Sequence, residues 1–499
     1  ITDTVGSVFL GVTYGCARCH DHKFDPILHK DYYRMQAFFA NLKIEDHAVM
    51  GTLEEKRSYQ EQLAHWEEQT KGIRDEMHNL LQPRIQAAYN SGLRRFPDDV
   101  KQAIARPANE KSPMDWQVYW KALPQMEISD ASAAKALNPA NRAKYDALQA
   151  ALAKYPKPRE LPTAQVMIDG SSAAPPVHVL RGGNIDAKAE EVHPGFLSIL
   201  DATDAKVTPT ATSTGRRSAL AQWLTDPKNP LPARVIVNRV WQYHFGHGIA
   251  PSSSDLGRMG GVPSHPELLD YLTSRFISQG WSLKKLHREI LLSATYRQSP
   301  DFRAAAAEAD PSNKLLWRFP RRRLEGEAVR DSMLAVSGLL NPQAGGPGVF
   351  PKLPAGTGQV RGGWRSNEDP KQAARRSVYI FVRRNNRYPM MQAFDMPSAA
   401  ESCAYRQPTV TPSQSLELMN DDVVLDWAKA LAARVRNDAG MSVDSQVART
   451  FRFAYGRDPS ESEKTSAVGF IAKEKLLGAD GLVSLAHSLF LSNEFLYLE

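Results

Sequence analysis

The chain has 499 residues, of which 42% are hydrophobic, and its 62 Lys and Arg exceed its 55 Asp and Glu to give a formal net charge of +7. One hydrophobic core does not normally serve a chain of this length, so we expect several domains. The sequence has no run of about 18 apolar residues, which argues against a membrane-spanning helix, and its modest, dispersed positive charge permits anionic partners without indicating nucleic acid.

Cysteine usage and the N-terminus bear on the class of protein. The sequence holds three cysteines, too few for a disulfide scaffold, and two of them lie close together. The chain begins with Ile1 and lacks the basic segment and apolar stretch of a secretory leader. We therefore expect a processed or shortened piece of a longer protein.

The first two segments are expected to be helical. Residues 1–51 read as the C-terminal part of a domain that carries "CARCH", with helix around that motif and over "DYYRMQAFFANL". Residues 52–160 predict an inserted, coiled-coil-like helical hairpin that could also mediate self-association, although surface helices packed on a globular core fit the same spacing. Pro83 is expected to interrupt its first helix. The seam of that helix consists of Leu63, Trp66, Thr70, Ile73, Met77 and Leu80.

The remainder of the chain introduces a little β structure and then more helix. Residues 161–210 predict a small β-containing segment and linker, with strands at "AQVMIDG" and "VHVLRGG". Residues 211–499 predict a mainly helical C-terminal domain, with a long loop at 341–369 and one strand around 378–382. The expected fold is thus mainly α and multi-domain, with a helical hairpin and a small β element.

The motif "CARCH" carries the clearest chemistry. On a helix Cys16, Cys19 and His20 would share one face, because residues three and four apart are neighbours there. Two thiols can add to the vinyl groups of haem as thioethers, and the adjacent imidazole can ligate the iron, so the pattern C-x-x-C-H favours covalent haem c.

Zinc and a redox disulfide are the alternatives to haem. A closed zinc site needs two ligands besides Cys16 and Cys19, and the nearby histidines do not follow a standard spacing. A redox disulfide normally follows a strand–turn–helix pattern, which the sequence lacks here. For haem, the sixth iron ligand is unknown, and Met35, His47 and Met50 are the candidates far enough along the chain to fold back.

Arginines form the densest basic patches. Arg383, Arg384 and Arg387 are candidates for anion binding, and residues 321–323 form a second patch, because guanidinium groups bind carboxylates and sulfates through two hydrogen bonds. Salt bridges to neighbouring acidic residues are the competing interpretation. His244 is expected to brace a loop, and Cys403 is expected to be a buried, inert thiol.

A family resemblance follows from several stretches in a consistent order. "FLGVTYGCARCHDHKFDPILHKDYYRMQAFF", "TGRRSALAQWLTDPKNPLPARVIVNRVWQYHFGHGI" and "FDMPSAAESCAYRQPTVTPSQSLELMND" resemble the planctomycete cytochrome c proteins, the PSCyt/PSD family of unknown biochemical function. The resemblance implies an exported periplasmic or cell-surface protein, often linked to polysaccharide degradation. It supplies no catalytic residues, and only Cys16, Cys19 and His20 map onto a motif with a known chemical role.

Three functions are consistent with these observations. The first is an exported c-type haem protein that transfers electrons to a redox partner still unknown. The second is an extracellular enzyme or binding protein for anionic polysaccharide, with a structural or zinc-bound cysteine pair. The third is a surface scaffold that assembles through the helical hairpin. Whether the protein is an enzyme is left open by the sequence.

Overall fold

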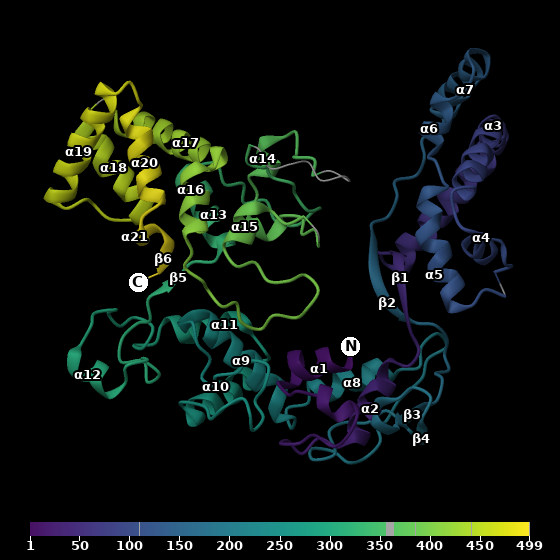
Figure 1. Ribbon diagram of the computed structural model, residues 1–499, viewed down its shortest axis with the longest axis horizontal. Coiled ribbons are helices and arrows are strands. Elements are labelled where there is room, and N and C mark those ends of the chain that lie inside the picture. The colour runs from purple at the N-terminus through teal and green to yellow at the C-terminus, as the bar shows by residue number, and fades with distance from the viewer. Residues whose placement is uncertain (109, 356–363, 385, 441, 499) are drawn as a thin grey trace. The chain divides into compact units, whose positions relative to one another are not determined.

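The computed structural model describes residues 1–108, 110–355, 364–384, 386–440 and 442–498 (Figure 1). Over these residues the protein is mainly helical and its strands form three two-stranded sheets, which confirms the expected fold class. Contacts group the chain into two compact units, one of residues 42–170 and one of residues 1–41 with 171–499. The four-segment, multi-domain organisation stays a prediction. Within the described ranges, no helix has both the length and the apolar character needed to cross a membrane.

The unit of residues 42–170 begins and ends with paired strands. β1 (Leu42–Val49) runs antiparallel to β2 (Thr163–Asp169), with a bulge between Glu45 and Ala48. β2 confirms the strand expected at "AQVMIDG", whereas β1 lacks apolar alternation and the sequence does not predict it. Between the strands lie α3 (Leu53–Leu93), α4 (Asp98–Ala105), α5 (Pro113–Ala122), η4 (Leu123–Gln125), α6 (Asp130–Lys135) and α7 (Pro139–Leu152).

α3 is a single helix of 41 residues. A capping box begins it, in which Glu55 N donates to Thr52 Oγ1 at 3.1 Å and Thr52 N donates to Glu55 Oε2 at 2.7 Å. The helix continues through Pro83, so the expected interruption is wrong. A proline inside a helix costs about 3 kcal/mol, and the apolar cluster of Leu81 with Tyr145 of α7, close to Pro83, offsets that cost.

The seam predicted for α3 is its covered face. Between residues 61 and 80, the six seam residues and Arg74 are the ones that are not exposed. Trp66 Nε1 donates to the carbonyl of Tyr155 at 2.9 Å, and Met77 packs against the cluster formed with α6 and α7. The seam is therefore occupied inside this unit. A coiled coil between chains stays a prediction.

In the other unit, residues 1–39 share a core with residues 177–224. β3 confirms the strand expected at "VHVLRGG" and pairs antiparallel with β4. Buried Tyr33, Met35 and Phe38 pack with Phe196 and Leu220 in one cluster. The elements are α1 (Thr2–Val5), η1 (Gly6–Leu10), η2 (Gly15–Arg18), α2 (His29–Gln36), η3 (Ala37–Phe39), β3 (Val177–Leu180), η5 (Arg181–Gly183), β4 (Lys188–Val192) and α8 (Arg216–Leu224).

Two charged side chains of α2 are buried in this core. Asp31 accepts hydrogen bonds from Leu28 N at 3.1 Å and Ser198 N at 3.2 Å, and also from the Ser198 hydroxyl. Arg34 donates to Ser198 Oγ at 3.2 Å and to Asp204 Oδ1 at 3.3 Å. Both side chains are almost completely enclosed. These contacts fix the irregular segment around residues 195–204 on α2.

The rest of this unit contains two further apolar clusters, one around α9 and one around the C-terminal helices drawn in yellow in Figure 1. A two-residue sheet of β5 (Arg322–Arg323) and β6 (Tyr497–Leu498) returns the C-terminus to the middle of the chain. The helices are α9 (Pro230–Phe245), α10 (Pro266–Ser278), α11 (Leu283–Leu291), α12 (Ala304–Ala309), α13 (Gly326–Val336), α14 (Pro370–Ala373), η6 (Ser377–Tyr379), α15 (Pro389–Ala393), α16 (Pro412–Asn420), α17 (Asp422–Ala439), α18 (Val443–Tyr455), α19 (Glu461–Leu476), α20 (Gly481–Phe490) and α21 (Asn493–Leu496).

The strand expected around residues 378–382 is wrong. This segment contains the 3-10 turn η6 and one isolated bridge, Val349 with Ile380. The backbone of this segment bonds locally and to Val349 instead: Ile380 N donates to the carbonyl of Ser377 at 3.0 Å, and Phe381 N donates to the carbonyl of Val349 at 2.9 Å. The described part of the loop expected at 341–369 contains isolated bridges, bends and turns but neither a helix nor a strand. Residues 356–363 of this loop lie outside the described residues.

Replacing Asp31 tests the anchor on α2. We expect Asp31→Ala to lower the free energy of unfolding by about 3 kcal/mol, because it removes a buried carboxylate that accepts from Leu28 N and Ser198 N and leaves those donors without a partner. Urea denaturation followed by circular dichroism measures the change. Asp204→Ala is the matched control, since Asp204 is largely exposed and surface ion pairs contribute at most about 1 kcal/mol. Equal losses for the two variants would contradict this assignment.

Candidate functional site

The "CARCH" motif forms a tight surface turn. η2 is one 3-10 turn, so the helix expected there is wrong. Ala17 is fully buried, whereas Cys16, Cys19 and His20 are exposed. The chain leaves the turn after Cys19 because the following residues fold into a loop of their own, closed by a hydrogen bond from His22 N to the carbonyl of Ile27 at 2.8 Å. Both cysteines are free thiols.

Two side chains of α2 form hydrogen bonds to the backbone of the turn. The carbonyl of Arg18 accepts a hydrogen bond from Tyr33 Oη at 2.8 Å and one from His29 Nε2 at 3.2 Å. Gly183 approaches the turn from η5 with φ of +74°, and a Cβ atom at this position would lie 2.8 Å from Cys19 Sγ. The glycine is thus required both by its backbone conformation and by the nearby sulfur.

The imidazole of His20 has a defined orientation. Its Nδ1 lies 2.7 Å from the carbonyl oxygen of Asp21. A carbonyl only accepts, so Nδ1 carries the proton and Nε2 keeps its lone pair. This is the arrangement that metal-ligating histidines commonly use, in which a backbone carbonyl fixes the tautomer.

The loop after the motif is structural. The side chain of His22 is buried, and its Nδ1 accepts a hydrogen bond from Asp25 N at 2.9 Å. Its Nε2 lies 3.3 Å from Thr13 Oγ1. Asp25 in turn accepts from Arg258 N at 2.8 Å. Both ring nitrogens of His22 are therefore engaged within the loop.

The zinc alternative receives no support from this geometry. Across the part of the chain that the structure describes, no group of three or more His, Cys, Asp or Glu side chains is placed to hold a metal ion. His22 and His29, which lie nearest to the cysteine pair in sequence after His20, make the hydrogen bonds given above. The motif therefore offers two exposed thiols and one exposed imidazole, which are fewer ligands than a closed zinc site needs.

The three candidates for a sixth iron ligand lie in different surroundings. Met35 is completely buried in the core with Tyr33 and Phe38. His47 is exposed on β1, and Met50 is exposed just after it, both within the unit of residues 42–170. Met35 is accounted for as a core residue, and none of the three is assigned as a ligand.

The predicted anion-binding arginines have different surroundings. Arg387 donates to the carbonyl of Met396 at 3.2 Å, the guanidinium of Arg383 lies 6.0 Å from the ring centre of Phe381, and Arg384 is exposed. Their anion-binding role stays a prediction.

The competing salt-bridge interpretation holds for the other basic patches. Arg323 pairs with Asp395 at 2.6 Å, and Arg376 lies 3.6 Å from Asp331.

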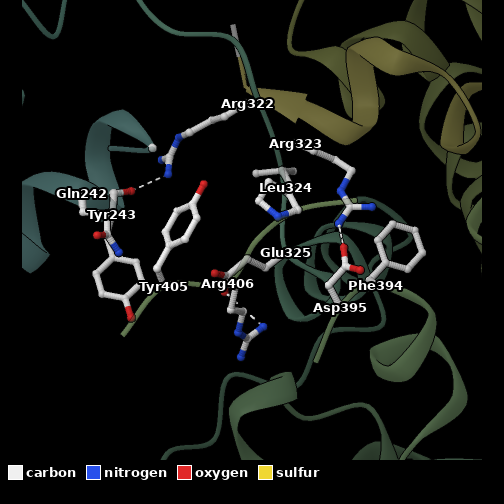
Figure 2. Close-up of a pocket in the computed structure, with 12 residues that line it drawn as sticks. Gln242, Tyr243, Arg322, Arg323, Leu324, Glu325, Phe394, Asp395, Tyr405 and Arg406 are labelled. Carbon is white, nitrogen blue, oxygen red and sulfur yellow. Dashed lines mark hydrogen bonds and ion pairs between the residues drawn. The ribbon is translucent and has the colours of Figure 1, made fainter. Parts of the chain in front are cut away.

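A pocket lies where β5 meets the end of α9 and the segment after α15 (Figure 2). Figure 2 shows Arg323 directed at Asp395 and Phe394, while Arg322 extends toward Tyr243. Arg322 and Arg323 were recognisable as a basic patch in the sequence. Another part of the wall comes from residues at least 79 positions away along the chain, and no local pattern indicates that they join the site; these residues are Gln242, Tyr243, Tyr405, Arg406 and Pro408.

Two residues near this pocket differ from expectation. Cys403 is exposed rather than buried, with Sγ 3.1 Å from the carbonyl of Tyr405. His244 is linked to a second histidine, since its Nε2 lies 2.8 Å from His287 Nδ1. Burial, the neighbouring His287 and the cation of Arg322 lower the pKa of His244 from 6.5 to about 4.

Comparisons with known proteins place the chain in a family. Residues 216–471, more than half of the chain, match PSD1, described as a protein of unknown function (DUF1553), and residues 1–44 match PSCyt2, described as a protein of unknown function (DUF1549). The chain therefore belongs to the PSD1 family. These are the planctomycete cytochrome c-associated domains, which confirms the resemblance seen in the sequence. The comparisons with curated proteins and with solved structures found no match.

The two matched regions are joined by buried hydrogen bonds. Arg239 of α9 donates to the carbonyls of Ser7 and Val8, both at 2.9 Å. Leu256 N donates to the carbonyl of Gly11 at 2.6 Å. With the bond from Arg258 to Asp25, these contacts make the motif-bearing segment part of the same compact unit as the PSD1 region.

The histidine pair predicts a pH dependence of stability. Because the folded state lowers the pKa of His244 to about 4, the unfolded chain binds a proton there first as the pH falls from 6.5. The free energy of unfolding should therefore decrease between pH 6.5 and about 4, and His244→Gln should reduce this slope. Urea denaturation across this range measures it, with His65→Gln on the exposed face of α3 as the control. An unchanged slope in His244→Gln would contradict the prediction.

Proposed function

We propose that this PSD1-family protein is an exported c-type haem protein with an electron-transfer role. Cys16 and Cys19 would hold the porphyrin, and His20 would ligate the iron through Nε2. The observation that carries the proposal is the hydrogen bond between His20 Nδ1 and the carbonyl of Asp21, which directs the lone pair to Nε2 beside two exposed thiols.

The chemistry of the donor set fits this group. Each thiol would add across one vinyl group, with the sulfur bonding to carbon and the thiol proton transferred to the other vinyl carbon, so attachment needs no further oxidant. Covalent attachment requires sulfur atoms that a bulky ring can reach, and both cysteines are exposed. A bound haem supplies a one-electron redox centre whose potential depends on axial ligation and burial.

The surrounding residues have a positioning role in this proposal. Tyr33 and His29 hold the carbonyl of Arg18, which fixes the direction of the turn between the two cysteines. Ala17 anchors the turn in the core without filling the outer surface. Gly183 leaves the space next to Cys19 Sγ open to η5, and a larger residue would crowd the sulfur.

Export follows from the same chemistry. Covalent haem is attached outside the cytoplasmic membrane, so a protein that carries it is periplasmic or on the cell surface. The polysaccharide hypothesis relies on the arginine-rich patches, in which Arg323 and Arg376 are already paired with Asp395 and Asp331. The scaffold hypothesis depended on the seam of α3, which is covered within its own unit. Neither has an observation that favours it over the haem protein.

The cysteine variants test the proposal. The full chain, exported with a leader peptide in a host that attaches haem c, should show a Soret band that survives acid–acetone extraction. Replacing Cys16 and Cys19 together with alanine should abolish this band, because both thioether positions are lost. Cys403→Ala is the matched control, since it removes an exposed cysteine far from the motif in sequence and should retain the band.

Two results would contradict the haem proposal. If the folded wild-type protein lacks the band while elemental analysis finds one zinc ion per chain, the haem proposal is wrong. A band that persists after both cysteines are replaced would show that haem binds elsewhere. Circular dichroism of each variant confirms that it has folded.

A further inference from the structure

The pocket of Figure 2 contains guanidinium groups whose hydrogen bonds are incomplete. The side chain of Arg323 is only 6% exposed. Its Nη2 donates to Asp395 at 2.6 Å, but among the described residues its Nε and Nη1 have no hydrogen-bond partner. Buried donors are normally satisfied, because water is no longer available to them. Two donors of one buried cation beside this pocket therefore have no hydrogen-bond partner among the described residues.

Arg322 forms no ion pair with a described carboxylate. Its Nη1 donates to the carbonyl of Tyr243, and its buried Nε has no partner within the described ranges. No carboxylate of the described residues lies within ion-pair distance of it. By contrast, Arg406 is paired with Glu327 through two hydrogen bonds of 2.7 and 2.9 Å. Arg322 is thus the cation of this pocket that a ligand could neutralise.

The charges around the pocket limit the ligand to one anionic group. Its lining includes the cations Arg322, Arg323 and Arg406 and the carboxylates Glu325 and Asp395. Asp395 is fully engaged: besides Arg323 it accepts from Thr409 N at 2.9 Å and Thr409 Oγ1 at 2.6 Å. Glu325 would repel a second negative charge. The cavity volume of about 80 Å³ holds more than one water and suits a carboxylate or sulfate group.

A larger cleft continues from this pocket. The two share Glu325 and Arg406, and the cleft has a volume of about 480 Å³. Exposed apolar side chains, including Val378 and Phe381, line it together with Arg387. An organic body attached to the anionic group would therefore find an apolar wall next to the arginines.

We propose that this pocket binds the carboxylate or sulfate group of a small organic anion, with Arg322 as the charged donor and Arg323 supplying further N–H groups. Guanidinium N–H groups form strong charge-assisted hydrogen bonds to both kinds of oxyanion. The adjoining cleft holds the body of the ligand. This site is separate from the cysteine motif and does not depend on haem.

Binding of defined anions tests the site. Isothermal titration of the full chain with acetate, benzoate, sodium sulfate and glucuronate should detect binding at millimolar concentrations or below. Tighter binding of benzoate than of acetate would assign the ligand body to the apolar cleft, and tighter binding of sulfate would assign a sulfate group. Benzyl alcohol, which lacks the charge, should not bind.

Arginine variants identify the residues responsible. Arg322→Gln should weaken anion binding about tenfold or more, because one charge-assisted interaction is lost. Arg297→Gln is the matched control, since Arg297 is exposed and lines neither cavity. Equal binding by Arg322→Gln and the wild type would overturn the proposal, as would the absence of binding for every anion.

A second measurement covers the case in which Arg322→Gln does not fold. Ligands that bind only the folded state raise the melting temperature, and the rise grows with the ratio of ligand concentration to Kd. The wild-type melting temperature should therefore rise with benzoate or sulfate more than with sodium chloride at the same ionic strength. Identical shifts for all salts would contradict a specific site.

Discussion

The buried charges of α2 are the constraint on which the motif-bearing part of the molecule depends. Asp31 and Arg34 occupy positions from which a charged side chain is normally excluded, and both form hydrogen bonds to the segment around residues 198–204. The same helix supplies Tyr33 and His29, which hold the carbonyl between the two cysteines. The orientation of the exposed thiols therefore depends on a charged anchor on the core side of one short helix.

The segment that carries the motif is also bonded to the much larger PSD1 region. The region that matches PSCyt2 ends soon after α2, yet Arg239 of the PSD1 region bonds to its first helical turns. The motif is thus carried by a large helical body rather than by a free-standing small domain. That body contributes a second candidate site at Arg322 and Arg323, in the same unit but built from different elements. The proposed redox group and the proposed anion site could serve one protein without sharing residues.

The sequence predicted the features that depend on local pattern. The α3 seam and the strands β2 and β3 follow from spacing and composition, whereas the role of Cys16, Cys19 and His20 stays a prediction. The 3-10 geometry of the motif does not follow from local pattern, because the neighbouring loop and α2 determine it. The failed strand at 378–382 has a similar cause, since its backbone bonds to Ser377 and Val349 rather than to a neighbouring strand. Tyr405 and Arg406 join the pocket through long-range packing, which one sequence does not reveal.

Peptide mapping of the exported full-length protein tests the central claim most directly. The protein is alkylated under denaturing conditions, digested, and analysed by mass spectrometry. The account predicts one peptide that contains residues 16–20, carries the mass of haem and has neither Cys16 nor Cys19 alkylated, while Cys403 is alkylated. Alkylation of both motif cysteines with no added mass would contradict it.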